Sequence, residues 1–270
     1  MAKLAPALAR VVVVLAALSV AGSSEARPHR APSRNHAHDA ARNTARHAAR
    51  HKKSLVTFSP SYASAPSYRY ASLSKEACVA ELDRRAIRYV AVDVAKGVLA
   101  PVRLPEGVGG VRYRTELPES ERATSPWEVF DCRLVLALHD FGAVLAEHGI
   151  AEAIIFSAWR PPGKRWPDDK LATRHPGALA LDVKALKLRE SGDWLSVKAD
   201  FAGRVGDVTC GPNAAPPVAP SARAATLRKL VCTAAAAHTF TSILTPNYDA
   251  AHHDHLHLEV TPEVKWQLVR

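Results

Sequence analysis

Hydrophobic positions are unevenly distributed along the 270 residues and divide the chain into three regions. A basic start at Lys3, an apolar run over 11–20 and small residues up to Ala26 form the pattern of a secretory signal peptide, residues 1–26. Residues 27–74 are rich in Ala, Arg, His, Ser and Pro and have few large apolar residues. They cannot bury enough surface to offset the entropy of ordering them, so we predict a disordered linker. Residues 75–270 show the periodic patterns of a folded domain.

The signal segment has a second interpretation, because residues 4–21 are long enough to be an uncleaved membrane anchor. Arg10 interrupts this stretch, which favours cleavage near Ala26 and no stable membrane span afterwards. In either case the rest of the chain is exported, and we expect a periplasmic or secreted protein.

Three helices are predicted within residues 75–270. Ser74 can cap a helix that runs to Arg85, and Ser221 can cap one that runs to Ala237. Between them, Ser125-Pro126-Trp127-Glu128 combines a capping box with proline at the first helical position, and it predicts a helix that ends at Gly149.

Short apolar segments rich in β-branched residues predict the strands. They cover residues 153–157, 178–184, 194–197, 241–245 and 255–260. Helices and strands do not alternate as repeated strand–helix–strand units, so we predict an α+β fold with a small antiparallel sheet flanked by helices.

The formal net charge of +10 is concentrated outside the predicted domain. Residues 27–75 carry a net charge of +9, whereas residues 76–270 have 24 basic and 24 acidic side chains. The balanced domain excludes nucleic acid as its partner. The basic arm predicts contact with peptidoglycan or another anionic envelope polymer. Its five histidines fit a solvated tether, with a metal-storing tract as the alternative.

Three segments carry residues that an ordinary core does not need. Arg160 follows a predicted buried strand, His175 precedes Asp182 by seven residues, and four histidines lie within 252–257. Side chains two apart in a strand share a face, so His255 and His257 point the same way. If the two strands are neighbours, His175, Asp182 and His257 converge on one metal ion. Two imidazoles, one carboxylate and an open position for water are the ligand set of a hydrolytic zinc site.

The same segments supply candidates for the other catalytic roles. Asp254 could act as the base, Arg160 could stabilise an oxyanion, and His255 could orient water or substrate. Trp159 adjoins the predicted site and could contact substrate. The ordinary alternative is that these are surface histidines and a salt-bridged arginine.

The order Arg, His-x6-Asp and His-x-His resembles the zinc D,D-peptidases of the D-alanyl-D-alanine carboxypeptidase and hedgehog-like group, and most closely the bacterial extensin-like proteins. The resemblance covers about residues 78–260 and implies a zinc site on the sheet. It implies zinc ligands at His175, Asp182 and His257, a base at Asp254, and substrate contacts at Arg160 and Thr173.

Two positions depart from the pattern of that group. Ala178 stands where a glycine is usual three residues after the first ligand, and Asp254 is shorter than the glutamate that many of these peptidases use. His252 is a second candidate for the base.

Four cysteines in an exported domain predict two disulfides, for which three pairings exist. Cys78 and Cys132 lie on the two early predicted helices, and Cys210 and Cys232 are close in sequence, so we predict Cys78–Cys132 and Cys210–Cys232. Zinc binding by these cysteines would need a closer spacing.

These features together predict an exported zinc peptidase that hydrolyses peptidoglycan stem peptides, at a D,D or an L,D bond, through zinc-activated water. The alternative is a non-catalytic envelope-binding extensin-like module with a structural zinc. A third hypothesis is metal sequestration by the histidine-rich arm.

Overall fold

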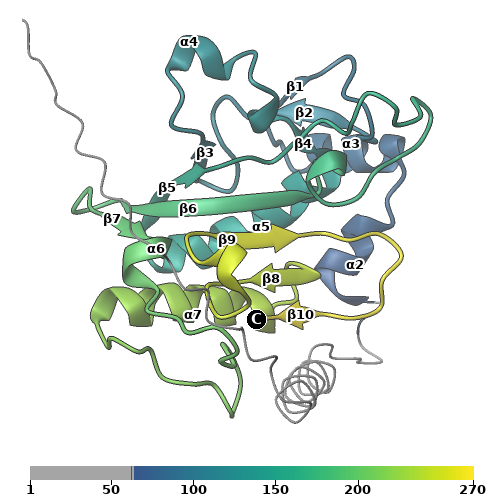
Figure 1. Ribbon diagram of the computed structural model, residues 1–270. Helices are drawn as coiled ribbons and strands as arrows, with labels where there is room; N and C mark the ends of the chain where they lie inside the picture. The colour runs from purple at the N-terminus through teal and green to yellow at the C-terminus, as the bar shows by residue number, and fades with distance from the viewer. Residues whose placement is uncertain (1–61, 63) are drawn as a thin grey trace, which may run out of the picture. The chain divides into compact units, whose positions relative to one another are not determined.

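The computed structural model describes residue 62 and residues 64–270 (Figure 1). The predicted signal peptide and residues 27–61 and 63 of the predicted linker lie outside the described residues. The folded part begins before the expected boundary at residue 75, because Pro66–Ala71 forms helix α2, which packs against α5 (Cys132–Glu147). Tyr70 is buried there and supplies apolar area that the composition of the linker did not suggest. No helix among the described residues is long and apolar enough to cross a membrane.

The helices begin largely where side chains can cap them. Ser74 accepts a hydrogen bond from the Ala77 amide, and Ser221 accepts one from Ala224, which confirms two of the predicted starts. Besides α2 and α5, the α-helices are α3 (Lys75–Arg84), α4 (Glu119–Arg122), α6 (Val197–Asp200) and α7 (Ala222–Ala236). Short 3-10 turns include η2 (Pro126–Glu128), η3 (His175–Gly177) and η4 (Ala250–His252).

The predicted start of the middle helix was wrong. Ser125 caps only η2, and the Glu128 carboxylate accepts hydrogen bonds from the amide and hydroxyl of Thr115 instead of closing a capping box. The chain then becomes extended at Phe130–Asp131, strand β4. Asp131 is the N-cap of α5 and accepts from the Arg133 amide at 3.0 Å. The tertiary partner of Glu128 therefore overrides the local helix signal.

In the described part of the chain, the strands form a seven-stranded sheet and a three-stranded sheet. The smaller sheet has the order β1 (Val90–Ala91), β2 (Pro101–Arg103), β4. The larger sheet has the order β10-β8-β9-β6-β5-β3, and β7 pairs with the far end of β6. Its members are β3 (Arg112–Arg114), β5 (Ile150–Ile155), β6 (Ala180–Leu188), β7 (Trp194–Ser196), β8 (Ser242–Leu244), β9 (Leu256–Glu259) and β10 (Leu268–Val269).

The architecture is α+β, as predicted, and each of the five predicted strands is present within a few residues. The larger sheet is mixed rather than purely antiparallel, because its edge pairs β3–β5 and β8–β10 are parallel. Both edge strands are only two or three residues long, so they carried no alternating pattern that could be recognised in the sequence.

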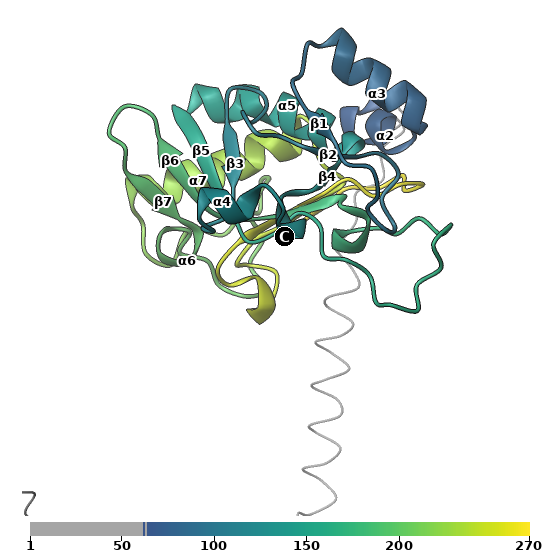
Figure 2. The same ribbon diagram turned by 90° about the horizontal axis from the view of Figure 1, so that it is seen from above.

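Helices α5 and α7 cover one face of the larger sheet (Figures 1 and 2). Alternate residues of the central strands, including Leu181 and Val183 of β6 and Leu258 of β9, join the helices in the main hydrophobic core. Successive side chains of a strand point to opposite faces, so Asp182 and His257 lie on the other face. The central strands therefore build the core on one side and present polar groups on the other.

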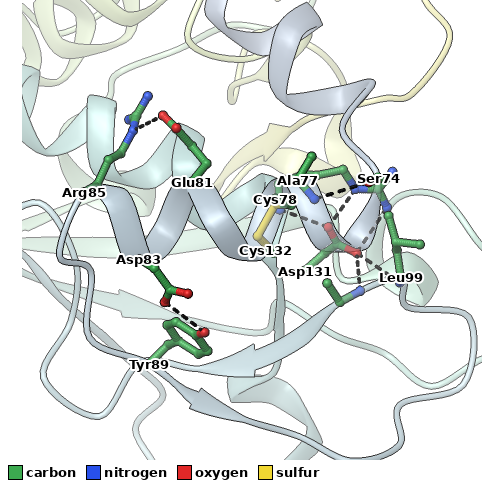
Figure 3. The surroundings of a disulfide bond; sticks show 12 residues. Ser74, Ala77, Cys78, Glu81, Asp83, Arg85, Tyr89, Leu99, Asp131 and Cys132 are labelled. Carbon is green, nitrogen blue, oxygen red and sulfur yellow. Dashed lines mark hydrogen bonds and ion pairs between the residues drawn. A yellow bond between two sulfur atoms is a disulfide. The ribbon is translucent and has the colours of Figure 1, made fainter.

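Both disulfides have the predicted pairing. Cys78–Cys132 ties α3 to the first residue of α5, beside the buried Asp131 carboxylate, which also accepts hydrogen bonds from the amide of Leu99 at 3.1 Å and from Arg133 (Figure 3). Cys210–Cys232 ties the long loop after α6 to α7. The two bonds fix both helices that support the central strands.

Candidate metal centre

His175, Asp182 and His257 come together on the polar face of the larger sheet. Asp182 and His257 are direct cross-strand partners in β6 and β9, and His257 Nδ1 lies 2.9 Å from Asp182 Oδ1. His175, the first residue of η3, places its Nε2 3.1 Å from the same oxygen. All three side chains are buried, and one potential ligand atom from each lies within 4.8 Å of the others. The three residues predicted to converge thus form one cluster.

A tight turn aims His175 at the cluster. A Cβ on Gly177 would lie 2.2 Å from the carbonyl oxygen of Ala172, so only glycine fits at this point. Ala178 follows in the left-handed conformation, with φ of 52°. Glycine adopts that conformation with less strain than alanine, so the turn that carries His175 holds a strained residue at position 178.

Each histidine of the cluster is held by a second acceptor on its outer side. His175 Nδ1 donates to the carbonyl oxygen of Ala158 at 2.9 Å, and His257 Nε2 lies 3.1 Å from the Glu259 carboxylate. These outer bonds direct the remaining ring nitrogen of each histidine towards Asp182. Histidines that bind metals are usually held by such a carbonyl or carboxylate partner. Two nitrogens and a carboxylate oxygen, so oriented, fit a divalent metal such as zinc.

The charges in the cluster are strongly coupled. Burial lowers the pKa of His257, but hydrogen bonds to Asp182 and Glu259 outweigh burial and raise it to about 9. Burial raises the pKa of Asp182, yet hydrogen bonds from His175 and His257 hold it well below its usual range. The Asp182 carboxylate thus stays ionised and attracts positive charge to the space between the rings, whether as protons or as a metal cation.

Arg160 reaches the same carboxylate from the adjoining loop. One guanidinium nitrogen donates to Asp182 Oδ2, whereas the closest contacts of His175 and His257 are with Oδ1. The Arg160 Nε donates to Ser157 Oγ at 2.8 Å. The Arg160 amide also donates to the His175 carbonyl at 3.1 Å. Because the arginine side chain is 53% exposed, a fixed positive charge is available to a molecule that enters the site.

His255 links Asp254 to the cluster. His255 Nε2 lies 3.5 Å from Asp182 Oδ1, and its Nδ1 lies 2.9 Å from Asp254 Oδ1. The carboxylate of Asp254 contacts His253 and His255, so its route to the cluster runs through the His255 ring. His252, the second candidate base, has its ring centre 5.1 Å from that of His255 and is itself held by Asp249.

Trp159 and Thr173, which were predicted to contact substrate, lie outside the three-residue cluster. Trp159 packs with Val98 and Val129 and donates from its indole nitrogen to the Pro176 carbonyl, so it supports the turn that carries His175. Thr173 lines a cavity of about 550 Å³ whose lining includes none of the three cluster residues. The structure gives Trp159 a packing role and places Thr173 beside a separate cavity.

Several residues of the site were missed in the sequence. Glu259 follows His257 by two positions and Lys184 follows Asp182 by two, so the alternation that found the cluster could have identified both. Phe156 gave no such signal, because its place depends on the tertiary fold. Its ring meets the His255 ring edge-on, with the centres 5.8 Å apart, and the Lys184 ammonium lies 5.6 Å from its centre.

Comparison with known proteins concerns the second half of the chain. Neither the curated proteins nor the solved structures gave a match. Residues 164–270 match the family described as extensin-like protein C-terminus. The matched part contains His175, Asp182, Asp254 and His257, whereas Arg160 and strand β5 precede it. Residues 164–270 of this chain are therefore similar to the C-terminal part of extensin-like proteins.

Proposed function

We propose that this protein is an exported zinc peptidase that hydrolyses the stem peptides of peptidoglycan, at a D,D or an L,D bond. The observation that carries the proposal is the way in which both histidine rings are held in place. His175 and His257 each turn one ring nitrogen towards Asp182 and use the other to bond a fixed acceptor, Ala158 O or Glu259. A buried carboxylate between two such rings has the composition and orientation of a zinc ligand set.

Zinc held by these three residues would act as a Lewis acid that activates water for attack on a peptide carbonyl. Arg160 is suited to bind the carbonyl oxygen of the substrate, because its half-exposed guanidinium already lies at Asp182. Negative charge develops on that oxygen as the carbonyl is attacked, and a preformed cation stabilises it. The contact with Ser157 limits the rotation of the arginine and keeps the charge in place.

Proton transfer falls to Asp254 and His255 acting as a pair. The Asp254 carboxylate accepts from His255 Nδ1, which leaves Nε2 on the side of the cluster to take a proton from the attacking water. The same proton can then pass to the leaving amine. The predicted base, Asp254, would thus act through His255 by holding the ring in the productive tautomer and stabilising its charged form.

Metal analysis and digestion of purified muropeptides test the proposal. Wild-type protein should bind one zinc per chain and shorten stem peptides, and Asp254→Ala should keep the zinc but lose most of the cleavage. Asp193→Ala, which removes an exposed carboxylate from the β6–β7 loop, is the matched control and should cleave normally. Folded, zinc-loaded wild type that cleaves no stem peptide contradicts the proposal. Cell-wall binding by that same protein would then favour the non-catalytic envelope-binding alternative.

A further inference from the structure

A pocket of about 280 Å³ lies between the smaller sheet, the edge strand β3 and helix α4, which are close together in Figure 1. No residue of the metal-binding cluster lines it. The smaller sheet supplies apolar side chains from its strands or from directly beside them: Val90 in β1, Leu104 after β2 and Phe130 in β4. Leu104 and Phe130 are buried, whereas Val90 is exposed. The pocket thus has a buried apolar floor and an exposed apolar edge.

Positive charge is in excess around this floor. Three arginines and two glutamates line the pocket, which gives its lining a net charge of +1. Arg112 is exposed on β3, and its side chain makes no hydrogen bond or ion pair with any residue that the structure describes. Arg122 lies 3.9 Å from Glu119 and 4.0 Å from Glu128, at the outer limit of an ion pair. The carboxylates of the lining therefore leave the arginines incompletely neutralised.

Arg103, the third arginine, has backbone partners in place of a carboxylate. Its guanidinium donates to the carbonyl oxygens of Ser125 at 2.8 Å and Arg122 at 3.3 Å. Burial lowers the pKa of Arg103, and the charge of Glu128 offsets this only in part. A cation that is taken out of water is normally paired with an anion, because the loss of hydration is otherwise poorly compensated. An anion that enters the pocket would supply the missing charge.

A carboxylate fits this lining better than a phosphate does. One negative charge balances the net charge of +1, and a planar carboxylate can accept two parallel N–H bonds from a guanidinium. A phosphate monoester carries about −1.5 to −2 charges at pH 7 and would place surplus negative charge beside Glu119 and Glu128. The floor formed by Leu104 and Phe130 suits an apolar group attached to the carboxylate.

We propose that this pocket binds a small organic carboxylate, whose charged group lies between Arg103 and Arg112 and whose apolar group packs on Phe130. The volume is just below the range of drug-sized sites, about 300–1,000 Å³, so the ligand is a compact acid with a single ring or a short chain. The site is independent of the proposed peptidase activity, because the pocket and the metal-binding cluster share no residue.

Four small probes test the class of ligand. They are benzoate, benzamide, acetate and inorganic phosphate, and their Kd values are measured by calorimetry on the full chain. Benzoate should bind on the order of tenfold more tightly than benzamide, which lacks the charge, and than acetate, which lacks the ring. Benzamide or acetate that binds as tightly as benzoate contradicts the proposed ligand class, and so does phosphate that binds more tightly.

Three variants test the place of binding. Arg112→Gln removes a cation that has no partner to lose, and it should weaken benzoate binding on the order of tenfold. Ala123→Trp keeps every charge but fills the pocket, so it should abolish binding. Arg88→Gln is the matched control, because Arg88 is an exposed arginine that pairs with Glu106 outside the lining, and it should bind benzoate as wild type does.

Thermal unfolding of each variant shows whether the fold is kept. Unchanged benzoate affinity in folded Arg112→Gln and Ala123→Trp overturns the site. An equal loss of affinity in Arg88→Gln and Arg112→Gln overturns it as well, because binding would then follow the overall charge rather than the pocket. Since none of these measurements involves peptide cleavage, their outcome is separate from that of the muropeptide digestion.

Discussion

Replacing Glu259 by glutamine tests whether the outer partner of His257 supports a metal centre. Glu259 is 4% exposed and lies 3.1 Å from His257 Nε2, and its other oxygen accepts from Thr261 at 2.7 Å. Glutamine keeps the volume and one acceptor oxygen but removes the charge that makes His257 a stronger ligand. Loss of such a partner typically lowers metal affinity about 10- to 100-fold, which is about 1.4–2.7 kcal/mol.

The same loss should be visible in thermal stability. At a zinc concentration 100 times the wild-type Kd, bound metal stabilises the fold by about 2.7 kcal/mol. A tenfold weaker site would retain about 1.4 kcal/mol of this at the same concentration. For a domain of this size the zinc-induced rise in Tm should therefore be about 3–5 °C smaller in Glu259→Gln than in wild type.

Two measurements decide the outcome. Competition against a zinc chelator of known affinity gives the Kd, and thermal unfolding with and without zinc gives the shift in Tm. Glu263→Gln, at an exposed position four residues away, is the control and should match wild type. His257→Ala should abolish tight binding. Normal zinc affinity in Glu259→Gln together with loss in His257→Ala refutes the supporting role of Glu259, and normal affinity in both refutes the metal centre.

Three further predictions concern pH and stability. Because the pKa of His257 is raised to about 9, zinc must displace its proton below that pH, and chelator competition should show affinity rising up to about tenfold per pH unit from 7 to 8. In the metal-free protein that proton stabilises the fold fully below the unfolded value of 6.5, and its contribution is lost as the pH rises through 9, so denaturant midpoints should fall over this range. Ala86 ends α3 with φ of 52°, so Ala86→Gly should raise the free energy of unfolding by about 1 kcal/mol, and an unchanged Tm would contradict this. Replacing Cys78 and Cys132 with alanine opens a loop with a sequence separation of 54 and should cost about 4 kcal/mol in urea unfolding; a loss below about 1 kcal/mol would argue against the predicted constraint.

Local signals predicted much of the fold because the responsible interactions are themselves local. Ser74 and Ser221 cap their helices through amides three residues away, and the alternation in β6 and β9 is a property of each strand alone. The helix start that was wrongly predicted at Ser125 has a cause that is not local. Glu128 bonds Thr115, a residue thirteen positions earlier, and no pattern near Ser125 records that partner.

The candidate site likewise has features that local patterns predicted and features that depend on the tertiary fold. Strand alternation was enough to place Asp182 and His257 on one face, and the fold then brought His175 to them through a turn. The contacts of Phe156 could not be predicted, because they depend on which strands are neighbours. The role of Asp254 was predicted from spacing, but its contact with the ring of His255 emerges only in three dimensions.

The site can form only when β6 and β9 pair in the correct register. Asp182 faces His257, while their neighbours Leu181 and Leu258 face each other on the core side. A slip of one residue would send a carboxylate into the core and set a leucine among the histidines. High-affinity zinc binding would thus report that the central strands have reached their native register, and a zinc-sensitive signal during refolding would time that event.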